Sequence, residues 1–318
     1  MKKGIVSLGE ALIDFIPLDK ENVNFQKSPG GAPANVAVGL ARLGAKSTFV
    51  GKVGDDVLGR FLQETLSEYG VRTDHMLLSA DVRTGLVFVT NTEDGERSFD
   101  FYINPSADRF LKPEEISERD LHNHKILHFG SISMISNPAK QAIIHAVELA
   151  KQKGLIISYD PNLRLGLWDS EQQAKDTIIS MLGKADVLKI SEEELEFITG
   201  EKDIDTGVEK LSQYHIPLIV VTLGAEGSYV FTQDGKAHVD ALKVKAVDTT
   251  GAGDAFVSGM LYSLNEHEGS VDSITLPEAV TMARFASVSG ALAASTKGAM
   301  TALPVLEEVK KHLKKAGM

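Results

Sequence analysis

Short apolar runs alternate with amphipathic segments along almost the whole chain, and this alternation leaves few folds open to it. Six runs predict buried strands, at Ile5–Leu8, Ser47–Val53, Ile126–Phe129, Leu155–Tyr159, Val187–Ile190 and Leu218–Thr222. Helical patterns lie between them, for example at 57–69, 138–153, 171–182 and 206–214. Because the strands are continuously apolar, we expect an α/β fold with a mostly parallel sheet covered by helices on both faces. From Thr249 onward the pattern predicts almost only helix.

Two stretches, at 13–26 and 85–108, break this pattern. In the second, two runs of alternating polarity flank Asp94-Gly95, a dipeptide typical of hairpin turns. Alternation indicates a sheet with one face in water. We therefore expect a small antiparallel β lid, formed by about 13–28 and 85–108, within a single domain that spans 1–318. An extension at the edge of the main sheet is the alternative.

Composition excludes several classes of function. The net charge is −11 and basic residues do not cluster, which argues against nucleic acid or an anionic membrane as partner. The absence of cysteine excludes disulfides and thiolate chemistry. Glu10 and Asp14 interrupt the N-terminal apolar run before a secretion signal could form. With no long apolar segment either, we expect a cytoplasmic protein.

Polar residues follow the predicted strands at the positions where open α/β sheets bind ligands, the carboxyl ends of the strands. Five strands are involved, namely four of the predicted strands above and a further short run near Val244–Val247. The residues that follow the five strands are Gly9, Glu10 and Asp14; Asp160, Asn162 and Arg164; Ser191 to Glu194; Gly224 and Gly227; and Asp248 to Asp254. We expect these acids and glycines to converge on one edge of the sheet.

The run "DTTGAGD", residues 248–254, predicts an anion site. Gly251, Ala252 and Gly253 have almost no side chain, so their backbone N–H groups can approach a phosphoryl group at the start of a helix. Asp254, one turn into that helix, could accept a proton from a nucleophile. The alternative is an aspartate that only caps a buried helix. A dinucleotide fingerprint is excluded, because Phe256 stands where its third glycine belongs.

The run "SPGGAPANVAVGLARLG", residues 28–44, predicts a helix that begins after a tight turn at Gly30 and Gly31. Pro33 suits the first helical turn and Gly44 the end of the helix. Asn35 then projects from the first turn with one donor and one acceptor, which suits a polyol hydroxyl. A plain helix start is the alternative, but it leaves the two adjacent glycines unexplained.

Two charged residues could bind phosphate or metal. Arg164 could bind a phosphate or a substrate oxygen, or could pair with a surface acid. Glu194 could hold Mg²⁺ directly or through water, although three consecutive glutamates more often form a solvated helix face. The chain has no P-loop and no protein-kinase motif. A phosphate nest, a carboxylate base and polyol-binding residues together favour phosphoryl transfer from ATP to an alcohol.

The sequence resembles the ribokinase/PfkB family of sugar kinases over essentially its whole length. "GGAPANVAVGLARLGAKSTFVGKVG" is similar to the family's N-terminal signature and "DTTGAGDAFVSGML" to its C-terminal one. Within the family the likeness is greatest to fructokinases, through "GEALIDF", "INPSAD", "DPNLR" and "LEFITG". The resemblance implies a ribokinase-like αβα three-layer sandwich with a mostly parallel central sheet and a small antiparallel β lid.

The resemblance also implies roles for individual residues. Asp254 is expected to be the catalytic base and the backbone of Gly251, Ala252 and Gly253 the anion hole. The residues expected on the sugar side are Asp14, Gly30, Gly31, Asn35, Tyr102 and Arg164. The residues expected on the ATP side are Ser191, Thr222, Gly224 and Gly227. The residues expected at metal ions are Glu194 for Mg²⁺ and Asp248, Thr250 and Gly298 for a monovalent cation such as K⁺.

The chain departs from the family in one motif. The family's N-x-x-E appears here as Ser191 to Glu194, so an asparagine is replaced and water contacts to magnesium are in doubt there. Ile103, which follows Tyr102, favours a neutral sugar over a sugar acid. We therefore hypothesise ATP-dependent phosphorylation of D-fructose at its 6-hydroxyl. The alternatives are 2-keto-3-deoxygluconate kinase, ribokinase or another sugar kinase, a sensor without turnover, and a dinucleotide-dependent oxidoreductase. Edge pairing of lid strands would give a homodimer.

Overall fold

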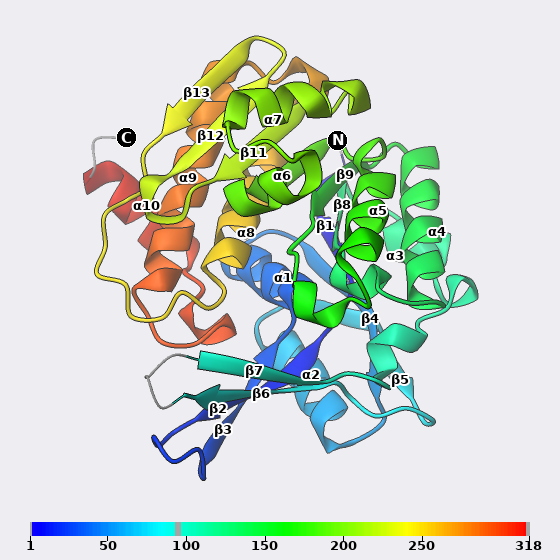
Figure 1. The fold of residues 1–318 in the computed structure, drawn as a ribbon. Coiled ribbons are helices and arrows are strands. Elements are labelled where there is room, and N and C mark those ends of the chain that lie inside the picture. The colour runs from blue at the N-terminus through cyan, green and yellow to red at the C-terminus, as the bar shows by residue number, and fades with distance from the viewer. Residues whose placement is uncertain (1, 93–96, 316–318) are drawn as a thin grey trace.

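The computed structural model describes residues 2–92 and 97–315, which form a nine-stranded sheet and a separate four-stranded sheet (Figure 1). The large sheet has the order β13-β12-β11-β10-β9-β8-β1-β4-β5. Its strands from β5 to β11 pair in parallel, and β12 and β13 pair antiparallel at one edge. The strands are β1 (Ile5–Leu8), β4 (Ser47–Gly54), β5 (Arg72–Ser79), β8 (Ile126–Gly130), β9 (Ile156–Asp160), β10 (Val187–Ser191), β11 (Leu218–Thr222), β12 (Ser228–Thr232) and β13 (Gly235–Val239).

Helices cover both faces of the large sheet, as the continuously apolar strands predict. Side chains of α4 to α7 form one buried cluster with one face of the sheet, and those of α1, α8 and α9 form another with the opposite face. The helices are α1 (Ala32–Arg42), α2 (Val57–Glu68), α3 (Glu118–Leu121), α4 (Ala139–Gln152), α5 (Glu171–Leu182), α6 (Glu192–Thr199), α7 (Ile204–Leu211), α8 (Ala252–Glu266), α9 (Leu276–Ala294) and α10 (Leu306–Lys315). Within the described residues, no helix is both long enough and apolar enough to cross a membrane.

The sequence-based expectations for the large sheet are confirmed, with one exception. All six predicted strands form, and each boundary lies within one residue of the prediction. The exception is the run near Val244–Val247, which is not a strand. The N–H groups of Val247 and Asp248 donate to the carbonyl of Ala294 at the end of α9, at 2.8 and 3.2 Å. The segment is short and bonds to a helix end, so it reaches the edge of the sheet as a loop.

The two irregular stretches form the second sheet, with the order β3-β2-β6-β7. Its strands are β2 (Leu12–Pro17), β3 (Phe25–Gly30), β6 (Leu86–Asn91) and β7 (Arg97–Tyr102). Both hairpins, β2–β3 and β6–β7, are antiparallel, and the central pair β2–β6 is parallel. Because this sheet is separate from the large one, the prediction of a distinct small sheet is confirmed, and an edge extension is excluded. The hairpin turn predicted at Asp94-Gly95 lies outside the described residues.

Close packing of α1 against α8 brings the two signature segments together. A Cβ on Gly39 would lie 2.3 Å from the Ser258 hydroxyl oxygen, so glycine is needed there for the helices to approach. The Ser258 hydroxyl donates to the carbonyl of Asp254 at 2.7 Å and lies 3.2 Å from that of Val36. Two helices far apart in sequence are therefore held side by side.

Candidate active site

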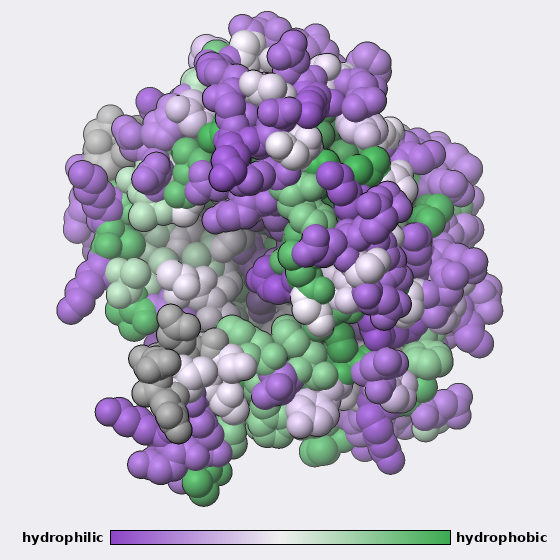
Figure 2. All heavy atoms as spheres, in the orientation of Figure 1, coloured by the Kyte–Doolittle hydropathy of each residue, from purple (hydrophilic) through white to green (hydrophobic). Residues whose placement is uncertain are grey.

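A cleft of about 570 Å³ lies between the small sheet and the carboxyl edge of the large one. Figure 2 shows the hollow from outside, with hydrophilic residues inside it and hydrophobic residues on the small sheet below. Most of the lining comes from the segments that the sequence singles out. The polar side chains and glycines that line it are Glu10, Asp14, Gly31, Asn35, Asp160, Asn162, Arg164, Lys189, Ser191, Glu194, Thr249, Thr250, Gly251, Gly253 and Asp254.

Asp254 lies in the first turn of α8 and projects into this cleft. Its Oδ2 accepts a hydrogen bond from Asn35 Nδ2 at 2.8 Å. Burial raises the pKa of Asp254 to about 6, against the opposing effect of this hydrogen bond. Asn35 is 6% exposed, and its Oδ1 has no hydrogen-bond partner within the part of the chain that the structure describes. A buried acceptor without a partner is costly, so the cleft is prepared for a ligand that donates a hydrogen bond there.

The turn before α8 exposes backbone N–H groups to the cleft. Gly251, at the N-cap, has a φ of 76°, a left-handed conformation that favours glycine. The N–H groups of Gly251, Gly253 and Asp254 have no acceptor among the described residues, whereas that of Ala252 donates to the Thr249 carbonyl at 3.1 Å. Of the N–H groups predicted to form an anion nest, that of Ala252 is therefore already engaged, while that of Asp254 is free among the described residues.

The tight turn at Gly30 and Gly31 shapes the space around Asp14. A Cβ on Gly30 would lie 2.3 Å from Asp14 Oδ2, so only glycine leaves room for that carboxylate. Gly31 has a φ of 100°, and a Cβ there would lie 2.5 Å from the Glu10 carbonyl oxygen. Both adjacent glycines thus have a reason that a plain helix start does not give. Burial raises the pKa of Asp14 to about 7, and the charge of Asp254 adds to the shift.

Glu194 is the one buried residue of the three consecutive glutamates. It is 8% exposed, while Glu192 and Glu193 are exposed, so the solvated-face alternative does not hold for it. Its oxygens accept the backbone N–H groups of Leu163 at 2.6 Å and Ser191 at 2.9 Å. The Ser191 hydroxyl in turn accepts the N–H of Glu194 at 3.2 Å, which completes a capping box. Burial raises the pKa of Glu194, while Lys189 opposes the shift.

Asp248 joins two loops beside the nest. It is 6% exposed, and its carboxylate accepts the N–H groups of Thr250 at 3.0 Å and Gly298 at 3.2 Å. Gly298 has a φ of 102°, again a conformation that favours glycine. The three residues predicted at a monovalent cation are therefore in contact. Among the described residues, however, no cluster of three or more His, Cys, Asp or Glu side chains could hold a metal ion.

The other predicted site residues differ in whether they line the cleft. Arg164 lines it, has no acidic partner among the described residues, and donates to the Leu163 carbonyl at 3.0 Å. Thr222 ends β11, in register with Ser191. Gly224 and Gly227 flank the turn that follows β11, and neither is among the residues that line the cleft. A Cβ on Gly227 would lie 2.1 Å from the Val239 carbonyl, which gives this glycine a packing role as well.

Tyr102 is not brought to the cleft. It is 62% exposed, and its ring packs edge-on against Phe88 at 5.6 Å. Successive residues of a strand face opposite sides of the sheet, so Phe99 and Phe101 line the cleft instead. The alternation in this stretch is the signal that could have identified these two rings from the sequence.

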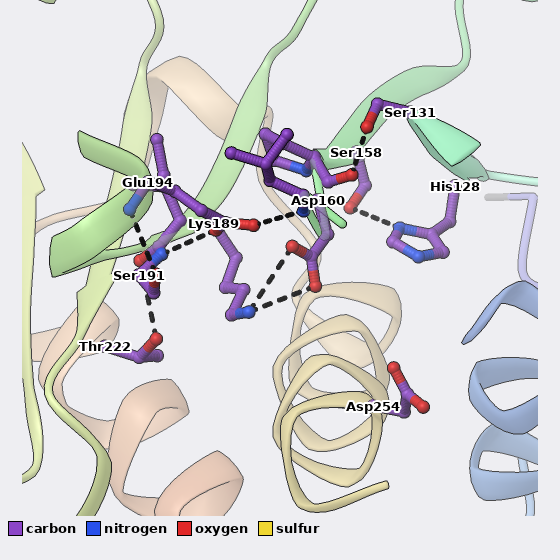
Figure 3. A network of polar contacts seen from close by, with 12 residues as sticks. His128, Ser131, Ser158, Asp160, Lys189, Ser191, Glu194, Thr222 and Asp254 are labelled. Carbon is purple, nitrogen blue, oxygen red and sulfur yellow. Dashed lines mark hydrogen bonds and ion pairs between the residues drawn. The ribbon is translucent and has the colours of Figure 1, made fainter. Parts of the chain in front are cut away.

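Sequence reasoning also missed Lys189 and gave no role to Asp160 and Glu10. Lys189 Nζ lies 3.2 Å from Asp160 Oδ2, and both side chains are largely buried (Figure 3). The signal was a single charged residue within the otherwise apolar strand Val187–Ile190. Glu10 is 2% exposed, and its Oε2 accepts the Ser133 hydroxyl at 2.5 Å. Burial raises the pKa of Glu10 to about 7, and the nearby acids Asp108 and Asp254 add to the shift.

Known proteins resemble this chain over nearly its full length. The family model described as "pfkB family carbohydrate kinase" matches residues 2–306. The probable chloroplastic fructokinase-6 of Arabidopsis thaliana is 47% identical over 320 residues, which cover 98% of this chain and 83% of that protein. The fructokinase of Vibrio cholerae O395, solved with fructose, ADP and calcium bound, has a TM-score of 0.89 and 41% identity, with 98% of each chain covered. The fructokinase of Xylella fastidiosa, solved with ATP bound, has a TM-score of 0.92 and 34% identity, with 100% of each chain covered.

Proposed function

This chain belongs to the pfkB family of carbohydrate kinases, and from that premise we propose that it transfers the γ-phosphoryl group of ATP to the 6-hydroxyl of D-fructose. One observation carries the proposal. The half-buried Asp254 carboxylate lies beside the free backbone N–H groups that begin α8 and accepts a hydrogen bond from Asn35, whose other amide atom has no partner among the described residues. A proton acceptor, an anion nest and a polyol contact thus meet at one point.

The sugar is held by groups on the lid side of the cleft. Asp14 and Asn35 bind ring hydroxyls, with Asn35 Oδ1 accepting one of them. The absence of a side chain at Gly30 leaves room for the Asp14 carboxylate at this position. Phe99 and Phe101 cover the bound sugar and keep water from the reacting atoms. Arg164, which forms no ion pair with any described acid, is available to bind a sugar or phosphate oxygen.

Transfer requires one proton acceptor and one anion site. The O6 oxygen of fructose attacks the γ-phosphorus while the bond from phosphorus to the bridging oxygen breaks, and its electron pair leaves with ADP. The O6 proton moves to the Asp254 carboxylate, which must be ionised beforehand. The free N–H groups of Gly251, Gly253 and Asp254 bind the phosphoryl oxygens as their charge redistributes. Positioning and this nest provide most of the acceleration.

If Mg²⁺ is bound with ATP, it would neutralise part of the phosphate charge. Glu194 is the carboxylate that we propose for Mg²⁺, and each of its oxygens already accepts a backbone N–H. It therefore fits a contact through water better than a direct ligand. Thr222, Gly224 and Gly227 form the nucleotide side, at the end of the strand next to Ser191.

A monovalent cation such as K⁺ fits the buried carboxylate of Asp248, which joins the loops of Thr250 and Gly298. When bound, it places positive charge beside the nest.

We also propose that the protein is cytoplasmic, and that it forms a homodimer through the small sheet. Supporting the dimer, β3 and β7 are unpaired edges, and Phe25, Phe88 and Tyr102 form an aromatic cluster on that sheet. Light scattering after size exclusion tests this assembly: a monomer at micromolar concentration would contradict it.

A sugar panel tests the proposed activity. ADP release is measured with D-fructose, D-ribose and 2-keto-3-deoxygluconate, and ³¹P NMR identifies the phosphorylated position. We expect D-fructose to give the highest kcat/KM, with phosphate on the 6-hydroxyl. A higher kcat/KM with either other sugar, or phosphate at another hydroxyl, would contradict the proposal.

A further inference from the structure

Lys189 is the one charged residue of the central strand β10. Its neighbours Leu188 and Ile190 are fully buried, and its own side chain is only 15% exposed. A lysine is rarely buried in a strand without a specific partner or task. Its ammonium reaches the cleft at the end of β10, beside the residues of the candidate active site.

Asp160, at the end of the adjacent strand β9, holds this ammonium. Lys189 Nζ lies 3.3 Å from Asp160 Oδ1 and 3.2 Å from Oδ2, so the carboxylate binds with both oxygens (Figure 3). Burial alone would lower the pKa of Lys189, but the carboxylates of Asp160 and Glu194 outweigh it and raise the pKa. Lys189 therefore stays charged at neutral pH.

The same ammonium lies beside the anion nest. A Cβ on Gly253 would be 3.9 Å from Lys189 Nζ, and the N–H of Gly253 has no acceptor among the described residues. An ammonium has three donors, and Asp160 does not use all of them. An anion held by the nest would thus meet a positive charge that is already in place.

The charge balance of the cleft points the same way. Its described lining contains the carboxyls of Glu10, Asp14, Asp160, Glu194 and Asp254, but only two cations, Lys189 and Arg164. A polyphosphate would be repelled by such a lining unless cations lie where it binds. Arg164 is exposed and Lys189 is fixed, so Lys189 is the better preorganised of the two.

We infer that Lys189 is a catalytic residue of this kinase: its ammonium binds oxygens of the transferring phosphoryl group together with the nest, and Asp160 is the residue that positions it. The inference rests on the proposed function. In the transfer step, the O6–phosphorus bond forms, the bond to the ADP oxygen breaks, and the O6 proton goes to Asp254. Lys189 keeps its proton throughout and acts only through its charge and hydrogen bonds.

The test replaces Lys189 and a matched buried lysine. Lys52 is 8% exposed and pairs with Glu115 at 2.6 Å, outside the cleft, so Lys52→Met measures the cost of deleting a buried ion-paired lysine. We expect Lys189→Met to lower kcat by about 10²–10³-fold, the loss typical of one transition-state donor. Fructose KM should change by less than about threefold, because this contact is made mainly in the transition state. Lys52→Met should leave kcat within about threefold of wild type, whatever its effect on stability.

A binding measurement separates catalysis from folding. Calorimetry compares ADP alone with ADP plus aluminium fluoride and fructose, a combination that mimics the transferring phosphoryl group. In Lys189→Met, affinity for the mimic should fall by about tenfold or more beyond any loss for ADP, and Asp160→Asn should show a smaller loss of the same kind. A wild-type kcat with undiminished binding of the mimic would overturn the inference while leaving the kinase activity intact. Absence of fructose phosphorylation by the wild type would instead refute the proposed function.

If Lys189→Met does not fold, Lys189→Arg decides the question. Arginine keeps a charge for Asp160 but moves it and replaces a compact ammonium with a planar fork. We expect kcat to fall at least about tenfold with ADP affinity unchanged. A folded Lys189→Arg protein with wild-type kcat and wild-type binding of the mimic would overturn the inference.

Discussion

The two ends of the cleft use the same residue type in opposite ways. At the end of the cleft proposed for ATP, the carboxylates of Asp160 and Glu194 are bound by Lys189 or by backbone N–H groups. At the end proposed for the sugar, Glu10 and Asp14 have no cationic partner among the described residues, and burial raises the pKa of each to about 7. Asp254 lies where the two ends meet.

This difference shows how environment assigns roles to identical side chains. A carboxylate bound to a cation or to N–H groups is a rigid structural part that holds other groups in place. A carboxylate left without a cation seeks hydrogen-bond donors, and sugar hydroxyls are such donors. In the proposed function, the acids of the sugar end therefore bind a polyol, while those of the ATP end position the groups that meet phosphate.

The largest effect on kcat is expected at Asp254, where the two ends of the cleft meet. Asp254→Asn keeps the shape of the side chain and its contact with Asn35 but removes the proton acceptor. We expect kcat to fall by at least about a hundredfold, with ATP affinity nearly unchanged. Steady-state kinetics and nucleotide titration measure both quantities. Near-normal turnover would show that Asp254 is not the base, and the contrast between the two ends of the cleft would then not hold.

Asp14→Asn tests the sugar end separately. A charged hydrogen bond to a sugar hydroxyl is replaced by a neutral one, so we expect fructose KM to rise by about tenfold or more. The KM for ATP should stay within about twofold, because Asp14 lies on the lid side of the cleft. An equal rise in both KM values would show that the two ends are not separable in this way.

The pH dependence follows from the pKa values of the same acids. Asp254, with its pKa raised to about 6, must be ionised to accept a proton, so kcat should fall as the pH drops through about 6. The pKa of Asp14 is raised to about 7, so kcat/KM for fructose should also fall as the pH drops through about 7. A rate profile from pH 5 to 9 measures both limbs. Activity that is flat down to pH 5 would contradict the assignment.

The smallest effect concerns stability. The folded pKa of Glu10, about 7, lies above its usual value of 4.5, so the folded protein binds more protons in that window and loses stability as the pH rises through it. Glu10→Gln removes this loss, so relative to wild type it should gain about 1–2 kcal/mol between pH 5 and pH 8. Urea unfolding at both pH values gives the difference. The exposed Glu114→Gln is the control, and an equal response in the two variants would contradict the account.

The sequence could predict most of the large sheet because its signals are local. Runs such as Leu218–Thr222 are apolar without interruption, and a buried parallel strand needs nothing else to be recognised. The run "DTTGAGD" predicts an anion site from its glycines and the acid Asp254 at the start of a helix; the structure places this run at the cleft, and anion binding stays a prediction. The loop at Val244–Val247 was misread as a strand, because four residues cannot reveal that their partner is the end of α9.

What the sequence could not give depends on contacts between distant segments. The roles of Gly30 and Gly31 become clear only when Asp14 and Glu10 are seen against them. In the sequence, Lys189 is an isolated charge within an apolar strand. Its role becomes clear only when Asp160 and the nest are seen beside it. Tyr102 was chosen by motif, but the register of β7 turns it away from the cleft and brings Phe101 in.

The most direct test of the central claim is a crystal structure with fructose and a non-hydrolysable ATP analogue. The account predicts the fructose 6-hydroxyl within about 2.6–3.2 Å of an Asp254 carboxylate oxygen, with the γ-phosphate at the N–H groups of Gly251 and Gly253. A closed complex in which that hydroxyl lies out of hydrogen-bond reach of Asp254, or the γ-phosphate lies away from the nest, would contradict it.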